Sequence, residues 1–205
     1  MGLDGSGPAG LTIPLSSAFL PTPLNPATLM KNLLATFLAA LAMFVWGFAY
    51  YGVSGIPYKS LQPAQNVGAQ LDELFPTTGT YVIPDPRTEN DKLSKQLEKG
   101  PFATVHIRKG GTPAMDPLLM AKGFILGWVC CLMMAVLLAM TGIRGYGPRL
   151  VFILFAGVIM ALFTHGGDVI WWRQDWAWQI HTMIYSIGAW LVAGLLLACS
   201  PKAKD

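Results

Sequence analysis

The side chains best suited to ligand chemistry in this chain are two histidines near the ends of neighbouring apolar segments. His165 lies close to the end of the apolar segment 150–170, and His181 lies about one helical turn into the segment 176–199. If both segments form antiparallel helices, the two imidazoles come to a similar depth. Imidazole nitrogens ligate haem iron and divalent metals, and Asp168 adds a carboxylate. The pair is therefore a candidate site for a haem, a pigment or a metal ion.

No motif strengthens this ligand hypothesis. The sequence contains neither CxxCH nor HExxH, the spacings typical of attached haem and of catalytic zinc. Histidines at a membrane interface also commonly hydrogen-bond to neighbouring groups. We therefore expect no bound metal and no cofactor, and we keep haem or pigment binding at His165 and His181 as an alternative.

Tryptophans crowd the turn between the same two segments. Five of them lie near the ends of apolar segments: Trp46, Trp171, Trp172, Trp176 and Trp178. Indole rings favour the headgroup level of a bilayer, so we interpret the five as an anchor belt. A functional alternative is a quinone, pigment or lipid-headgroup site lined by these rings together with His165 and Arg173.

Other catalytic arrangements are missing from the sequence. It has no serine at nucleophile-elbow spacing, no glycine-rich phosphate loop after a predicted strand and no pair of carboxylates within an apolar segment. Cys130, Cys131 and Cys199 fall inside apolar segments, where cysteine is usually a small buried residue. The net charge of +3 is not gathered into a basic patch, which argues against nucleic-acid binding. The sequence thus predicts a protein that is not an enzyme.

Four long apolar segments must position these side chains. Only 12% of the 205 residues are charged and 53% are hydrophobic, whereas soluble domains carry about 25% charged residues. About 20 apolar residues cross the hydrocarbon core of a bilayer as a helix. The segments 29–52, 117–141, 150–170 and 176–199 each meet that length. The predicted fold class is an all-α membrane protein with four transmembrane helices.

The basic residues predict how these helices are oriented. Five of them lie near the ends that would share one side of the membrane: Lys31, Arg144, Arg149, Lys202 and Lys204. Positive residues favour the cytoplasmic side, which predicts that both termini are cytoplasmic. The tail 1–28 is rich in Gly and Pro and is predicted to be disordered, and 200–205 forms a second cytoplasmic tail. Residues 53–116, with seven acids and seven bases, are then extracytoplasmic.

The long segment 53–116 has the pattern of a small α/β cap. Residues 64–75 and 89–99 have helical patterns, and residues 80–83 and 102–107 have the β-branched and aromatic composition of strands. Two strands alone are only marginally stable. The cap is therefore expected to need the spans or a partner for support.

Small residues at helical spacing predict tight helix contacts. Pairs four residues apart occur in spans two, three and four: Gly123 and Gly127, Gly157 and Ala161, and Ala189 and Ala193. Small side chains let helices approach closely, either within the chain or against another subunit. The middle of each span lacks charged residues and breaks, and both absences count against an ion-coupled transporter.

Several short motifs occur in order between about residues 40 and 199: Phe44–Phe48, Phe75–Pro76, Gly79–Pro84, Gly100–Pro101, Gly111–Met115 and Gly188–Gly194. In these motifs the chain resembles a family of uncharacterised bacterial membrane proteins that have four spans and a small extracytoplasmic loop domain. The resemblance implies the same architecture and a bacterial inner membrane, but no established activity. The turn between the last two spans departs from the family pattern, because it is longer and richer in His and Trp.

These observations favour a non-catalytic accessory subunit of a membrane complex, with other membrane subunits and lipids as its partners. One alternative is a redox- or pigment-associated subunit in which His165 and His181 hold a cofactor. Another is a small transporter or channel, which the apolar spans do not favour.

Overall fold

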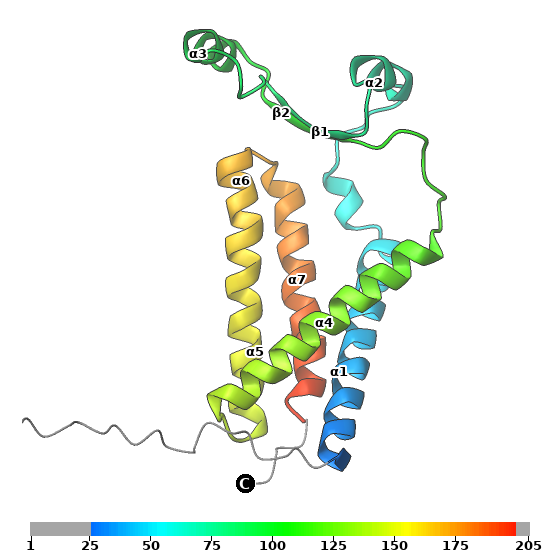
Figure 1. Cartoon of the computed structure of the whole chain (residues 1–205), viewed down its shortest axis with the longest axis vertical. Coiled ribbons are helices and arrows are strands. Elements are labelled where there is room, and N and C mark those ends of the chain that lie inside the picture. Colours follow the sequence, from blue (N-terminus) through cyan, green and yellow to red (C-terminus); the bar gives the residue numbers. More distant parts are fainter. Residues whose placement is uncertain (1–25, 200–205) are drawn as a thin grey trace, which may run out of the picture.

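The computed structural model describes residues 26–199, and Figure 1 shows their arrangement. In chain order the elements are α1 (Pro26–Gly47), η2 (Phe48–Val53), η3 (Pro57–Ser60), α2 (Gly68–Leu74), β1 (Gly79–Ile83), α3 (Asn90–Lys99), β2 (Ala103–Ile107), α4 (Pro117–Thr141), α5 (Tyr146–Ala161), η4 (Leu162–Gly166), α6 (Gly167–Trp172) and α7 (Trp176–Leu197). The segments η2 and η4 are π-helical, and η3 is a short 3₁₀ helix.

Within residues 26–199, four continuous helices are long and apolar enough to cross a membrane, as predicted: Pro26–Val53, Pro117–Thr141, Tyr146–Trp172 and Trp176–Leu197. The first consists of α1 with η2, and the third consists of α5, η4 and α6. These helices are compatible with an integral, multi-pass membrane protein. Of the tail predicted for 1–28, residues 1–25 lie outside the described residues, and residues 26–28 belong to α1. The second predicted tail, 200–205, also lies outside the described residues.

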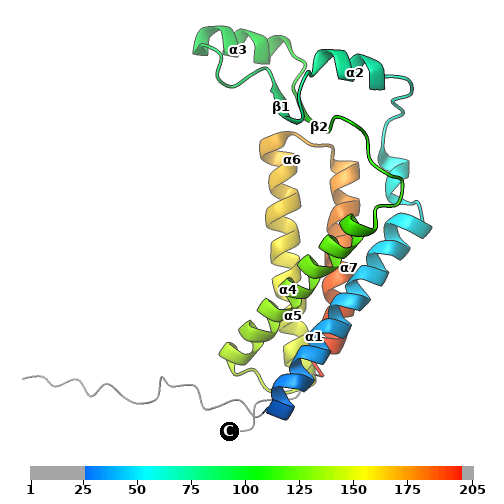
Figure 2. The same cartoon turned by 45° about the vertical axis from the view of Figure 1, so that its right-hand side comes forward.

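The helix α7 is the centre of the bundle. It packs against α1 on one side and against α5 on another, while α4 packs mainly against α1 and crosses the other helices obliquely (Figures 1 and 2). The cap lies beyond the opposite end of the bundle from the α4–α5 connection. We use the term cap side for that end.

The buried core lies in the middle of the bundle and toward the end away from the cap. Its buried members come from all four long helices: Ala39, Ala40, Cys131, Met134, Leu138, Ile153, Trp190, Ala193 and Leu197. The buried hydroxyl of Thr36 joins two of these helices, because it accepts a hydrogen bond from Trp128 Nε1 at 3.2 Å and donates one to Leu33 O at 2.8 Å. Its hydrogen-bonding capacity is thus met inside the bundle.

Small residues make the α5–α7 contact possible. A Cβ atom placed on Gly157 would lie 2.6 Å from Trp190 Cβ, which is closer than any real contact allows. Ala161, Ala189 and Ala193 are also buried, at 2%, 3% and 0% exposed. These four residues lie where the sequence pattern expects small side chains at helix interfaces.

The predicted pair Gly123 and Gly127 behaves differently. A Cβ atom at either position would meet nothing within 4 Å, so no other part of the described chain packs there. The prediction of tight contact at this pair within the chain is therefore wrong. Only the contact with another subunit remains as a hypothesis for these two glycines.

The bounds of the spans differ from their predicted positions, most of all in the third span, which begins at Tyr146 instead of residue 150. The third span continues to Trp172 instead of ending at residue 170, so that the hairpin turn before α7 contains only residues 173–175. The helices α1 and α5 are each followed directly by a π-helical segment: η2 ends the first span, and η4 lies within the third span, before α6. A pattern search at 3.6 residues per turn does not detect such a segment, because a π turn adds a residue without changing the composition.

The cap contains the two helices and two strands expected from the sequence. β1 and β2 pair antiparallel in the register Gly79↔Ile107 to Ile83↔Ala103. α2 begins at Gly68, four residues later than expected, and an ion pair from Lys109 to Asp72 ties it to the strand pair. In residues 61–116, which the structure describes throughout, Phe75 is the only buried residue. The cap therefore has almost no core of its own.

Candidate functional site

The densest group of chemically versatile side chains is an aromatic cluster on the cap side of the bundle. It joins α1, η2, η3 and α7, and its members are Trp46, Tyr50, Tyr51, Tyr58, Trp178, His181 and Tyr185. The π-helical segment η2 supplies Tyr50 and Tyr51, which are neighbours in sequence. π-helical turns occur often at functional sites, and this one lets both adjacent rings contact α7.

Each ring of the cluster contacts at least one other ring of the cluster. Trp46 stacks on Tyr50 with centroids 5.4 Å apart, and Tyr51 meets Tyr185 edge to face at 5.1 Å. Farther toward the cap, Trp178 lies 6.3 Å from Tyr51 and 6.5 Å from Tyr58. Aromatic pairs in these geometries stabilise by about 0.5–1.5 kcal/mol beyond the burial of their surface. The cluster therefore fixes the cap-side ends of α1 and α7 to each other.

Two hydrogen bonds cross the same contact. Tyr50 Oη and His181 Nδ1 are 3.0 Å apart, and Trp46 Nε1 donates to the backbone oxygen of Tyr185 at 3.0 Å. The indole also covers Gly188, where an added Cβ would lie 2.6 Å from Trp46 Cζ2. Both polar groups are thus satisfied in a largely apolar setting, where an unpaired one would be costly.

The two histidines do not face each other as a ligand pair. His165 Nε2 lies 2.9 Å from Ser186 Oγ, whereas His181 bonds to Tyr50. Positions 181 and 186 differ by about 140° around an α-helix, so that these hydrogen bonds lie on different faces of α7. Among residues 26–199, no group of three or more His, Cys, Asp or Glu residues is placed to hold a metal ion.

No family model, curated protein or solved structure matches this chain. The resemblance noted from the short sequence motifs therefore stays a prediction.

The five tryptophans predicted to form one belt fall into two groups. Trp171, Trp172 and Trp176 are exposed, at 79%, 49% and 56%, as expected for rings at a membrane interface. Trp46 instead contacts α7, and half-buried Trp178 belongs to the aromatic cluster. The tyrosines of the cluster and Gly188 were not predicted as site residues. The sequence signal for the tyrosines was the concentration of Tyr50, Tyr51 and Tyr58 at the end of the first span and just after it.

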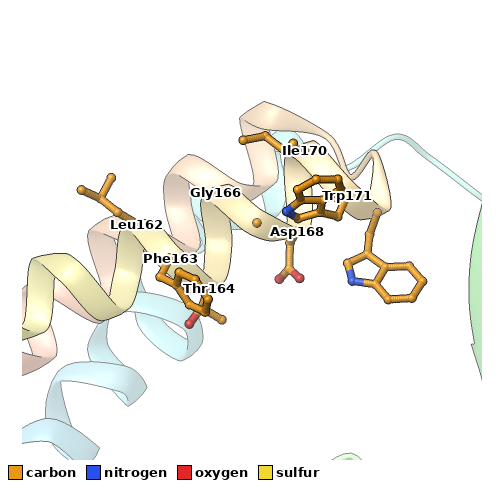
Figure 3. A pocket seen from close by; sticks show the side chains of 9 residues that line it. Leu162, Phe163, Thr164, Gly166, Asp168, Ile170 and Trp171 are labelled. Atoms are coloured by element: carbon orange, nitrogen blue, oxygen red, sulfur yellow. The ribbon is translucent and has the colours of Figure 1, made fainter.

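A groove of about 490 Å³ lies on another face of the cap-side end, along η4 and α6. It is lined by Leu162, Phe163, Thr164, Gly166, Gly167, Asp168, Ile170, Trp171 and Trp172. Figure 3 shows the carboxylate of Asp168 extending from the helix into the open space beside Trp171. The predicted headgroup site comprised the tryptophans, His165 and Arg173, but of these residues only Trp171 and Trp172 line the groove.

Arg173 connects the hairpin turn to the cap. Its guanidinium carbon lies 5.4 Å from the centroid of the Phe102 ring, close to the start of β2. The residue has a positive φ of 52°, which is unfavourable for a side chain other than glycine. The turn therefore holds a strained residue at the point where it touches the cap.

Replacing Tyr50 with phenylalanine removes its hydrogen bond to His181 and keeps the ring. We expect the unfolding free energy to fall by about 1 kcal/mol, with His181 Nδ1 left without its partner. Thermal unfolding in detergent measures the change. Tyr58→Phe is the matched control, because the Tyr58 ring belongs to the same cluster but is 52% exposed. Equal effects of the two substitutions would contradict the role of the hydrogen bond.

Replacing Arg173 with alanine removes the contact to Phe102 and leaves the strained backbone in place. We expect faster amide hydrogen exchange in β1 and β2, with no change in exchange within the cores of α5 and α7. Arg173→Gly removes the same contact but relieves the strain, so it should unfold with a free energy about 0.5–1 kcal/mol above that of Arg173→Ala. If exchange in the strands is unaltered in both variants, Arg173 does not hold the cap.

Proposed function

We propose that this protein is a non-catalytic accessory subunit of a multi-subunit membrane complex. Its parts are packing surfaces: spans that contact other membrane subunits and lipids, and a cap that contacts a partner on the same side. The proposal includes the predicted orientation, with both termini cytoplasmic and the cap extracytoplasmic, in a bacterial inner membrane.

The observation that carries the proposal is an ordered cap without a core. Residues 61–116 bury only Phe75, and their two strands form a ribbon that has no third strand. The register places Tyr81, Ile83 and Val105 on one face of this ribbon, and these side chains are only half-buried. Such a ribbon is marginal in water unless another surface covers it. A partner subunit is the cover that we propose.

The helix α4 supports the same proposal. It packs mainly against α1, and its half nearest the cap exposes apolar side chains such as Leu118, Ile125 and Leu126, which are 63%, 55% and 65% exposed. Gly123 and Gly127 lie in that half and contact no other helix of the described chain. This face offers close approach to a helix of a second protein.

The charges support the proposed orientation. Lys31, Arg144 and Arg149 lie at the end of the bundle opposite the cap. At the cap end, bases and acids are balanced. Under the positive-inside rule this difference favours a cytoplasmic position for the end away from the cap.

Co-purification from native membranes in a mild detergent tests the proposal. The eluate is analysed by mass spectrometry and by its visible absorption spectrum. We expect a stoichiometric set of other membrane proteins, and no absorption band that disappears in His181→Ala. Recovery of the protein alone at monomer mass would contradict an accessory role. A band that is lost in His181→Ala would favour the cofactor alternative instead.

A further inference from the structure

We infer that the groove along η4 and α6 binds the ammonium headgroup of phosphatidylethanolamine. Thr164, Asp168, Trp171 and Trp172 all line it. They follow the spacing i, i+4, i+7 and i+8, which places side chains on one face of a helix. The opposite face of the same segment packs on α7, to which His165 is joined by its hydrogen bond with Ser186. The groove is therefore on the outward side of the third span.

The lining of the groove favours a cation. Asp168 is the only ionisable residue among the nine that line it. Two exposed indoles, Trp171 and Trp172, follow this carboxylate by three and four residues, and the faces of aromatic rings attract ammonium groups. Of the lysines and arginines, Arg173 is the nearest to Asp168 in the sequence, and its guanidinium lies over Phe102 of the cap. The groove thus offers negative potential to a ligand, with no basic lining residue for an anion.

The length of the third span places this groove at the headgroup level. Arg149 is the last charged residue before the apolar run of α5. About 20 residues of helix cross a hydrocarbon core of about 30 Å, so the core that begins after Arg149 ends near Asp168. The carboxylate then lies at the boundary of the hydrocarbon, and Trp171 and Trp172 lie among the headgroups.

The polar atoms of the groove select among lipid headgroups. The primary ammonium of ethanolamine can donate hydrogen bonds to the Asp168 carboxylate and to the Thr164 hydroxyl. The methylene groups of the ethanolamine can then contact the indoles. Leu162 and Phe163, which are 56% and 85% exposed at the end away from the cap, offer apolar surface to the acyl chains. Phosphatidylglycerol has no cation, and its negative charge is repelled by Asp168.

Lipid binding to the purified, delipidated full-length protein tests this inference. Phosphatidylethanolamine and phosphatidylglycerol with identical acyl chains are titrated separately, and native mass spectrometry counts the bound lipids. We expect phosphatidylethanolamine to bind about tenfold more tightly than phosphatidylglycerol. Asp168→Asn should remove most of this preference, because it removes a charged hydrogen-bond acceptor. Trp171→Leu should weaken phosphatidylethanolamine binding without endangering the fold, because this ring is 79% exposed.

Two matched variants from the same hairpin are the controls. Asp175→Asn keeps the side-chain hydrogen bond at the N-terminus of α7, since Asn serves as an N-cap residue as well as Asp does. Trp176→Leu removes an exposed indole that does not line the groove. Both should keep the lipid preference. Equal binding of the two lipids by the wild type, or an unchanged preference in Asp168→Asn and Trp171→Leu, would overturn the inference. Because this test uses the isolated protein, its failure leaves the proposed accessory role untouched.

Discussion

Leucine in place of Gly157 will destabilise the bundle strongly, whereas leucine in place of Gly123 will leave its stability nearly unchanged. A Cβ atom at Gly157 would lie 2.6 Å from Trp190 Cβ and 2.8 Å from Trp190 Cγ. Those atoms are close to the α7 backbone and cannot swing away, so α5 and α7 must separate. Overpacking of this kind costs about 1–3 kcal/mol, and we expect a value at or above the upper end for leucine.

Gly123 is the matched control because it is also in an apolar span and no atom lies within 4 Å of its added Cβ. Unfolding in mixed micelles, followed by circular dichroism, measures both variants against the wild type. The intrinsic helix preference of leucine over glycine even favours Gly123→Leu slightly. Similar losses of stability in both variants would mean that the α5–α7 contact is not the close packing described above.

Alanine in place of Trp46 will have the second large effect. This indole covers Gly188, stacks on Tyr50 and donates a hydrogen bond to Tyr185 O. Fully buried Trp→Ala substitutions cost about 3–5 kcal/mol, and because Trp46 is half-buried we expect a loss of about 2–4 kcal/mol. Trp46→Phe keeps a ring and loses only the donor, so it should lose about 1 kcal/mol.

Trp171→Ala serves as the comparison, because its ring is 79% exposed. Its effect on unfolding should stay within about 0.5 kcal/mol, as for surface substitutions in general. The three variants are compared in the same mixed micelles. If Trp46→Ala and Trp171→Ala change stability equally, then Trp46 belongs to the interfacial belt and does not fasten α1 to α7.

The spans and the elements of the cap could be predicted from the sequence because their signals are local. A continuous apolar run identifies a span, and the strands β1 and β2 lie within one residue of the segments 80–83 and 102–107. Capping is local as well: Asp116 accepts hydrogen bonds from the backbone N–H groups of Leu118 and Leu119, at the predicted start of span two.

The site could not be predicted in the same way because it depends on which helix faces meet. The atoms of the Tyr50–His181 hydrogen bond belong to residues 131 positions apart. The two π-helical segments also rotate the helix ends away from the faces that a regular helical pattern implies. Composition therefore grouped Trp46 with Trp171, although one contacts α7 and the other is exposed.

The most direct test of the proposed role is the protein composition and mass of the particles that a membrane-solubilising polymer extracts from native membranes without detergent. A single chain has a mass of 22.2 kDa. We predict a particle in which this chain occurs in fixed stoichiometry with different membrane proteins, and in which crosslinks from β1, β2 or the cap-side half of α4 reach those proteins. A particle whose only protein is this chain, with a protein mass of 22.2 kDa or a multiple of it, would contradict the accessory role.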